Sequence, residues 1–196
     1  MPITGAGWEF HVERLGIHKS GARTRTYGTY QAFLDGQPIA ALSGNVCESP
    51  GPGENDTPAT PDKPRRIVQG RYPLSTQFGD HYATIGFTTE HPDQHPMPGL
   101  LLNNTGHRSA ILIHPGHPPT LYLSSIGCLN LTKPLQPDDV MDFLESRSRV
   151  IAVINSLANF AAGAFAHRTP TPIANAAIVI DGEPMNILPS AAAPVA

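Results

Sequence analysis

The sequence predicts a mostly β fold that carries one long helix. The first part of the chain contains β-forming runs joined by Asp35-Gly36, the two-residue signal of a β-hairpin. A single stretch, residues 137–163, spaces its apolar side chains at the helical period. Gly (18) and Pro (21) make up about a fifth of the 196 residues, a level that indicates many turns and loops in a folded chain.

The expected strands are short runs of β-branched, aromatic and apolar residues bounded by turn residues. They occupy residues 8–12, 26–34, 38–42, 66–69, 82–87, 100–102, 109–113 and 177–182. The runs at 100–102 and 109–113 are almost continuously apolar, which is typical of buried strands. These runs predict a strand-rich core whose central strands are covered on both faces.

Long loops and one helix complete the predicted fold. Residues 43–66 form a Pro- and Gly-rich segment with five prolines, and a connection this long is expected to be a functional loop or a linker. Pro137 is expected at the first helical position, with acidic residues directly after it, where the helix dipole favours anions. We expect one domain over residues 1–165 and a C-terminal extension over 166–196 with a short strand and a frayed tail.

The charge and hydropathy of the chain exclude several function classes. The formal net charge of −3 argues against non-specific binding to nucleic acid or to an acidic membrane surface. No run of about 18 apolar residues is present, so we expect no membrane insertion. The first twenty residues lack the apolar core of a secretory signal peptide. We therefore expect synthesis in the cytoplasm and export, where it occurs, by a route outside the general secretory pathway.

The two cysteines, Cys47 and Cys128, are too few for a disulfide scaffold. Cys47 matches no nucleophile motif, so we expect it to be a free or buried thiol. Cys128 follows Gly127 at the entry to an apolar run, and His114 ends an apolar run upstream. The Pro-rich segment between them must turn the chain back, which is expected to bring His114 and Cys128 side by side on adjacent strands.

A thiol beside an imidazole has a chemical purpose. Thiolate is the nucleophilic form of cysteine, and a neighbouring imidazole takes the thiol proton and stabilises the thiolate as an ion pair. Gly127 lets a substrate carbonyl approach the backbone, and N–H groups beside Cys128 are candidate donors to an oxyanion. The alternative interpretation is that Cys128 is a small buried hydrophobe and that His114 caps a strand end.

Four further residues are candidates for the same site. Ser125 is expected to hydrogen-bond within its turn or to assist Cys128 at the substrate. Arg108 is expected to pair with a substrate carboxylate, which its guanidinium fits bidentately, or to form a surface ion pair. Gly116 and Asn130 are the remaining expected substrate-binding residues.

The pattern His…Ser-x-Gly-Cys-hydrophobic-Asn resembles the active-site signature of the L,D-transpeptidases, the YkuD-like enzymes of bacterial cell walls. The matching positions are His114, Ser125, Gly127, Cys128, Leu129 and Asn130. The resemblance covers residues 66–132, and it extends to short uncharacterised domains of the group that include cell-wall-targeting effectors of type VI secretion. Two features depart from the pattern: Ile126 replaces a second His, and only ten residues separate the His from the Ser.

The resemblance implies a β-sandwich or barrel with the long helix packed on it, and cysteine chemistry without a cofactor or a metal. Cys128 would attack the carbonyl between an L-centre and a D-centre of a peptidoglycan stem tetrapeptide, with His114 as the base. D-Ala would leave and a thioester would form. Water would then give L,D-carboxypeptidase action, and an amine would give L,D-transpeptidation or D-amino-acid exchange.

A substrate outside the cytoplasm, together with the missing signal peptide, favours one more expectation. The protein would be an antibacterial effector that a secretion machine carries into the periplasm of a rival bacterium. Its expected partners are peptidoglycan stem peptides, an immunity protein and a secretion carrier.

Two other function classes stay open from the sequence. Six of the nine histidines lie between residues 81 and 117, and His91 and His95 have a spacing found in zinc sites. With His114 or Cys128 they would suggest a zinc-dependent peptidoglycan peptidase or amidase, although neighbouring prolines disfavour a shared helical face. The second alternative is a non-catalytic binding module of a phage or a secretion apparatus.

Overall fold

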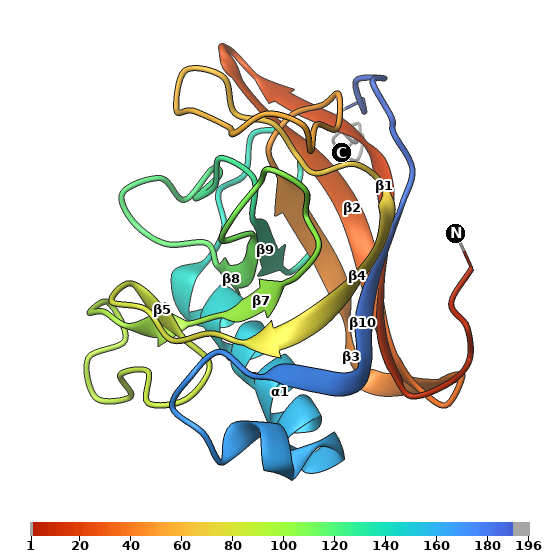
Figure 1. Cartoon of the computed structure of the whole chain (residues 1–196). Helices are drawn as coiled ribbons and strands as arrows, with labels where there is room; N and C mark the ends of the chain where they lie inside the picture. The colour runs from red at the N-terminus through yellow and green to blue at the C-terminus, as the bar shows by residue number, and fades with distance from the viewer. Residues whose placement is uncertain (1, 190–196) are drawn as a thin grey trace, which may run out of the picture.

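The computed structural model describes residues 2–189 and is mostly β, with one α-helix in that range (Figure 1). The barrel strands are β1 Trp8–Ser20, β2 Arg23–Leu34, β3 Gln37–Glu48, β4 Gly70–Thr76, β7 Leu100–Leu102, β8 Leu112–Pro115, β9 Leu129–Thr132 and β10 Pro172–Asp181. They close in the order β1-β10-β4-β7-β8-β9-β3-β2. Two short strands, β5 (Tyr82–Ala83) and β6 (Met97–Pro98), pair in parallel outside the barrel. The predicted mostly β class with a single long helix is confirmed.

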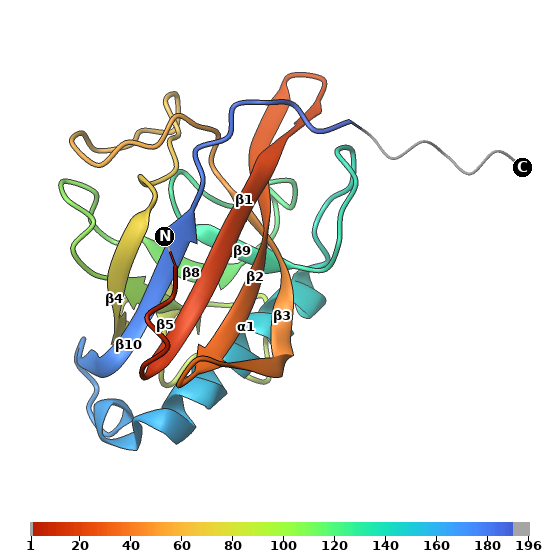
Figure 2. The ribbon, with the colours of Figure 1, turned by 90° about the vertical axis from the view of Figure 1, so that its right-hand side faces the viewer.

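The first three strands form a continuous antiparallel sheet, which Figure 2 shows beside β10 and β4. Asp35 and Gly36 connect β2 to β3 with backbone φ angles of 47° and 77°. A type I′ turn requires such left-handed values at both central residues, so the predicted hairpin is confirmed. β3 continues to Glu48, because its end pairs with both β2 and β9. The long loop therefore begins at Ser49, later than the sequence predicts.

The C-terminal part of the described chain is built into the barrel. β10 lies between β1, to which it is parallel, and β4, to which it is antiparallel. Ile178 and Ile180 on this strand are fully buried in the core. Residues 166–189 thus complete the barrel instead of extending a domain that ends at residue 165. The expected frayed tail, residues 190–196, lies outside the described residues.

The helix α1 spans Phe143–Phe160 and a short 3₁₀ helix follows at Ala162–Phe165. Its N-cap is Asp142, whose carboxylate accepts a hydrogen bond from the Glu145 N–H, so the helix starts later than the predicted Pro137. The residues just before Asp142 are not helical, and the Met141 N–H donates to the carbonyl of the distant Leu121 at 2.9 Å. Tertiary contacts, not the Pro-Asp-Asp signal, set this boundary.

Three other expected strands are absent, shorter or displaced. Residues 66–69 join no sheet, and the N–H groups of Val68 and Gln69 donate instead to the side chains of Asn55 and Glu183. The run at 82–87 pairs only at Tyr82–Ala83, and the run at 109–113 becomes β8 two to three residues later, at Leu112.

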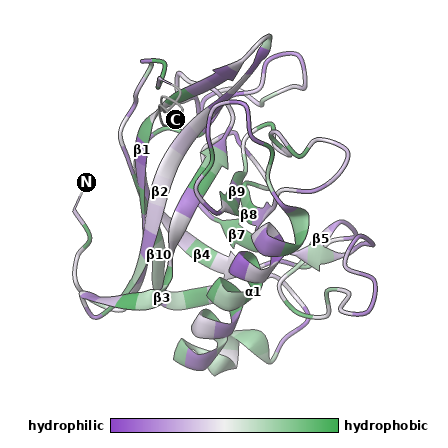
Figure 3. Ribbon diagram, turned by 180° about the vertical axis from the view of Figure 1, so that it is seen from behind, coloured by the Kyte–Doolittle hydropathy of each residue, from purple (hydrophilic) through white to green (hydrophobic). Residues whose placement is uncertain are grey.

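The barrel and the helix share one apolar core. Four buried side chains of α1 enter it: Val150, Val153, Ile154 and Leu157. The Trp8 indole at the end of the barrel donates to Ser156 Oγ on the helix at 3.0 Å. Figure 3 shows the apolar residues concentrated over β7, β8 and β9, with mostly polar loops around them. Within residues 2–189, no helix has the length and apolarity needed to cross a membrane.

A buried charge cluster ties the C-terminal segment to the barrel. The Arg14 guanidinium donates to Glu48 at 2.8 and 2.9 Å and to Glu183 at 2.9 Å, and Arg66 donates to Glu183 at 3.0 Å. Both arginine side chains are fully buried, so their charges depend on these carboxylates. Burial raises the pKa of Glu183, but the Gln69 N–H and the two guanidiniums outweigh it and lower the pKa overall.

Replacing Glu183 by Gln is expected to lower the free energy of unfolding by about 2 kcal/mol, because it removes one counter-charge from two buried guanidiniums. Since the pKa of Glu183 is lowered on folding, its contribution is full above the ordinary value of 4.5 and is lost as the pH falls below it. Urea titration at pH 7 and pH 4 measures both effects. Glu90→Gln, at an exposed position, is the control, and equal stability of the two variants would contradict the prediction.

Candidate active site

The site is built on two neighbouring parallel strands, β8 and β9. His114 on β8 is aligned with Asn130 on β9, and the same register places Cys128, just before β9, opposite Leu112. Because side chains alternate along a strand, Cys128 and Asn130 share one face while Leu129 points into the barrel core. The structure therefore brings His114 and Cys128 to adjacent strands, as the sequence predicts.

His114 is held as a neutral imidazole with a defined tautomer. Its Nδ1 lies 2.8 Å from the Pro115 carbonyl oxygen, which can only accept, so Nδ1 carries the proton. The ring is buried, and the Tyr82 ring packs on it at a centroid distance of 4.4 Å. Burial lowers the pKa of His114 to about 3, against a smaller opposing effect of the Pro115 hydrogen bond. Nε2 is thus the basic nitrogen.

Cys128 is a neutral thiol in the resting structure. Its Sγ accepts the Leu112 N–H at 3.3 Å and lies 3.6 Å from the Ala110 carbonyl oxygen. Burial raises the pKa of the thiol to about 11, although the Leu112 N–H and the charge of Arg108 act in the opposite direction. Among the described residues no hydrogen bond joins Sγ to His114, so the resting site is a neutral pair and not the expected thiolate–imidazolium ion pair.

Ser125 organises the turn that leads into Cys128. Its Oγ accepts the Gly127 N–H at 2.8 Å and donates to the Cys128 carbonyl at 2.8 Å. Of the two roles considered from the sequence, the structure shows the bond within the turn. The Gly127 N–H is consequently engaged within the turn.

Arg108 holds the same turn from the other side. Its side chain is buried and donates to the backbone carbonyls of Glu54 at 2.8 Å, Arg65 at 2.8 Å and Ile126 at 3.1 Å. These bonds hold the guanidinium against the protein backbone at the wall of the cavity beside Cys128, and it forms no ion pair among the described residues, so the expected substrate contact stays a prediction. A Cβ at Gly127 would collide with this guanidinium, which explains the glycine.

Asn130 and Gly116 lie behind the site and do not line it. The Asn130 side chain is fully buried, where its Oδ1 accepts the Ser124 N–H at 3.0 Å and its Nδ2 donates to the His114 carbonyl at 3.3 Å. Gly116 is packed against Met141. Both residues are buried and help to position the site. Neither is exposed to a ligand, so the substrate contacts expected of them are not available.

A cavity of about 340 Å³ opens beside the thiol. Cys128, Gly127 and the exposed Ile126 form one wall, and residues 107–111 form another. Pro58 and Ala59 of the long loop complete the lining, so the segment that follows β3 borders the cavity. The thiol is thus accessible to a small extended ligand.

Sequence reasoning missed two residues at the site, Tyr82 and His117. His117 Nδ1 lies 2.8 Å from the Pro118 carbonyl oxygen, so its Nε2 is the acceptor of a 2.8 Å bond from the Tyr82 hydroxyl. The His-Pro dipeptide at 117–118 repeats the one at 114–115, which was a usable signal in the sequence. Nothing in the sequence indicated Tyr82, because its place over His114 depends on the packing of β5.

The histidines between residues 81 and 117 do not assemble a metal site. His95 Nδ1 lies 3.0 Å from the His81 carbonyl oxygen, and the two rings pack edge to face at 4.6 Å. Within residues 2–189 no three His, Cys, Asp or Glu side chains are placed to hold one metal ion. The zinc alternative therefore has no ligand set among these residues.

Comparison with known proteins adds no family to this picture. No protein-family model, curated protein or solved structure matches the chain.

Gly127→Ala is expected to destabilise the protein by about 2 kcal/mol and to disturb the Cys128 turn, because its Cβ would displace the Arg108 guanidinium. Gly163→Ala is the matched control, since a Cβ there meets open space. Chemical denaturation measures the stability of both variants. Two equally stable variants would show that the Arg108 contact is not a constraint.

Alkylation of Cys128 by iodoacetamide is expected to be slow at pH 7 and to rise about tenfold per pH unit up to about pH 10, because the pKa of the thiol is raised to about 11. Cys47 is fully buried and should stay unmodified in the folded protein. Mass spectrometry of the alkylated peptides gives both rates. Fast alkylation that is independent of pH below 7 would instead reveal a resting thiolate.

Proposed function

We propose that the chain is a peptidoglycan-modifying cysteine enzyme of the L,D-transpeptidase-like kind, with Cys128 as nucleophile and His114 as base. One observation carries the proposal: adjacent parallel strands present a thiol at a cavity wall and an imidazole whose Nδ1 proton is fixed by a backbone carbonyl. The resemblance of the Ser-x-Gly-Cys-x-Asn segment to L,D-transpeptidases supplies the substrate class.

The neutral resting pair suits general-base catalysis. As Sγ of Cys128 attacks the carbonyl between the L- and D-centres, His114 Nε2 takes the thiol proton. The proton passes to the leaving amine, D-Ala departs and a thioester remains on Cys128. Water or an acceptor amine then attacks the thioester, and its proton returns to the thiolate through His114.

The turn around Cys128 supplies the backbone N–H donor for the oxyanion that forms when Sγ attacks the substrate carbonyl. Because Ser125 accepts the Gly127 N–H, we assign the role of oxyanion donor to the Cys128 N–H. Arg108 and Ser125 act as positioning residues, since they hold the turn and touch no reacting atom. No hydrogen bond joins His114 to the thiol among the described residues, so the proposed mechanism has the His114 ring, on which the Tyr82 ring packs, move toward the thiol when substrate binds.

The biological setting belongs to the same proposal. Stem peptides lie in the periplasm, so an antibacterial effector with an immunity protein and a secretion carrier is the role that fits a toxic wall enzyme. Expression of the chain with a periplasmic signal in a test bacterium should cause lysis that Cys128→Ala abolishes. Growth unaffected by the periplasmic protein would contradict the effector role.

The enzymatic reaction is tested with purified diaminopimelate-type muropeptides and mass spectrometry of the products. Wild type should release D-Ala, or exchange it when a D-amino acid is added, and Cys128→Ala should give no product. Cys47→Ala is the matched control and should keep the activity, because Cys47 lies in a separate buried cluster. His114→Gln should lower the rate by about 10²–10⁴. Identical products from wild type and Cys128→Ala would refute the proposal.

A further inference from the structure

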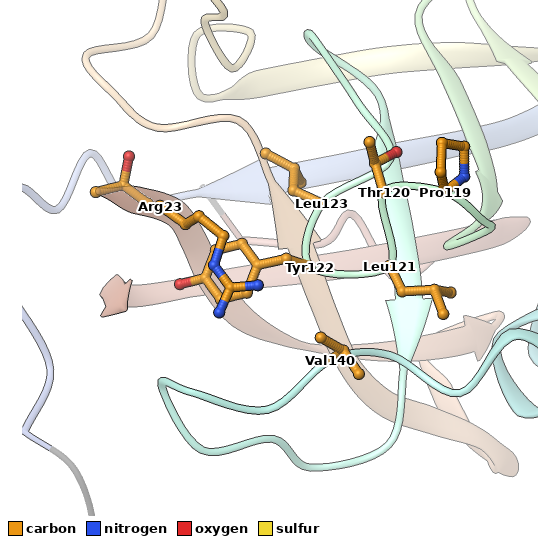
Figure 4. Close-up of a pocket in the computed structure, with 8 residues that line it drawn as sticks. Arg23, Pro119, Thr120, Leu121, Tyr122, Leu123 and Val140 are labelled. Carbon is orange, nitrogen blue, oxygen red and sulfur yellow. The ribbon is translucent and has the colours of Figure 1, made fainter. Parts of the chain in front are cut away.

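A second cavity lies on the other side of the segment that connects β8 to β9. Figure 4 shows its lining residues, which enclose about 550 Å³, a volume in the range of small-molecule sites. The walls are mostly apolar and include Pro119, Leu121, Leu123 and Val140. Val140 is half exposed, so part of this apolar wall is open to solvent. This cavity shares no lining residue with the one at Cys128.

Arg23 lines this cavity and a second arginine, Arg25, contacts the same tyrosine of its wall. Arg23 and Arg25 lie two residues apart on β2, and their guanidinium carbons are 4.4 and 4.3 Å from the centroid of the Tyr122 ring. Figure 4 shows the Arg23 guanidinium lying over that ring. The tyrosine thus holds the Arg23 guanidinium in place by cation–π attraction, and the lining contains no acidic residue.

Neither guanidinium is neutralised by the described residues. Arg25 is fully buried and donates to the carbonyls of Tyr122 and Gln136, but it forms no ion pair and its Nε has no hydrogen-bond partner. Exposed Arg23 makes one hydrogen bond, to Ser20 Oγ at 3.1 Å. The acidic neighbours Asp138 and Asp139 form no ion pair with either arginine within residues 2–189. Arg23 lines the cavity and Arg25 contacts the same Tyr122 ring, so an anion in the cavity would be attracted by both positive charges.

We propose that this cavity binds a small carboxylate with an apolar body, held by Arg23 and covered by the Pro119–Leu123 and Val140 walls. The planar guanidinium of Arg23 has several free N–H donors in the fork geometry that fits a carboxylate bidentately. The ligand comes from one of two sources with this shared chemistry: an aliphatic acid, or the C-terminus of a peptide that ends in an apolar residue. The site is independent of the reaction proposed for Cys128.

The probes are hexanoate and N-acetyl-leucine, each compared with its neutral amide, and binding is followed by backbone amide NMR. The amide signals of residues 120–123 and 23–24 should shift on addition of the carboxylates, and the neutral amides should bind at least about tenfold more weakly. Tight binding of hexanoate alone identifies an aliphatic acid, and tight binding of acetyl-leucine alone identifies a peptide terminus. Equal binding of acid and amide, or no shift at these residues at millimolar concentration, would overturn the proposal.

Two substitutions test the assigned roles of the lining. Arg23→Gln should weaken the carboxylates at least about tenfold and leave amide binding unchanged, and Val140→Asp should weaken them by placing a like charge at the mouth. Arg168→Gln, at an exposed arginine remote in sequence, is the matched control and should bind as wild type does. Cys128→Ala should also bind normally, which separates this site from the proposed enzyme. Unchanged carboxylate affinity in Arg23→Gln would refute the proposed carboxylate site.

Discussion

The structure depends on the parallel pairing of β8 with β9. Parallel neighbours need a crossover, and here residues 116–128 make it without a helix, so the returning chain must be held by other means. Arg108 ties this crossover to the loop that precedes β4, because it donates to the carbonyl of Ile126 and to those of Glu54 and Arg65, and Ser125 closes the turn. Without these contacts Cys128 would have no defined position relative to His114.

The same burial that orders the site also sets its chemistry. Removing His114 and Cys128 from water raises the pKa of the thiol and lowers that of the imidazole, so both are neutral at rest. A neutral thiol is protected from adventitious oxidation and alkylation. In the proposed mechanism, the thiol reacts once substrate binding brings the basic nitrogen of His114 into use.

Two groups of arginines show how differently the fold treats buried charge. Arg14 and Arg66 share Glu48 and Glu183, and this cluster fastens the segment after β10 to the barrel. Arg25 is equally buried but has only neutral acceptors among the described residues. The first arrangement is satisfied by the chain itself, whereas the second is the reason to look for an anionic ligand.

The sequence by itself determined the mostly β class, the Asp35-Gly36 hairpin and the buried run at 100–102, because each follows from local periodicity or turn chemistry. Only the tertiary structure decided that β8 pairs with β9 beside Cys128, that β10 lies between β1 and β4, that α1 starts at Asp142, and that Arg108 donates to three backbone carbonyls. The physical reason is that strand partners, helix boundaries and the acceptors of a long side chain depend on contacts between residues far apart in the chain, which no local pattern records.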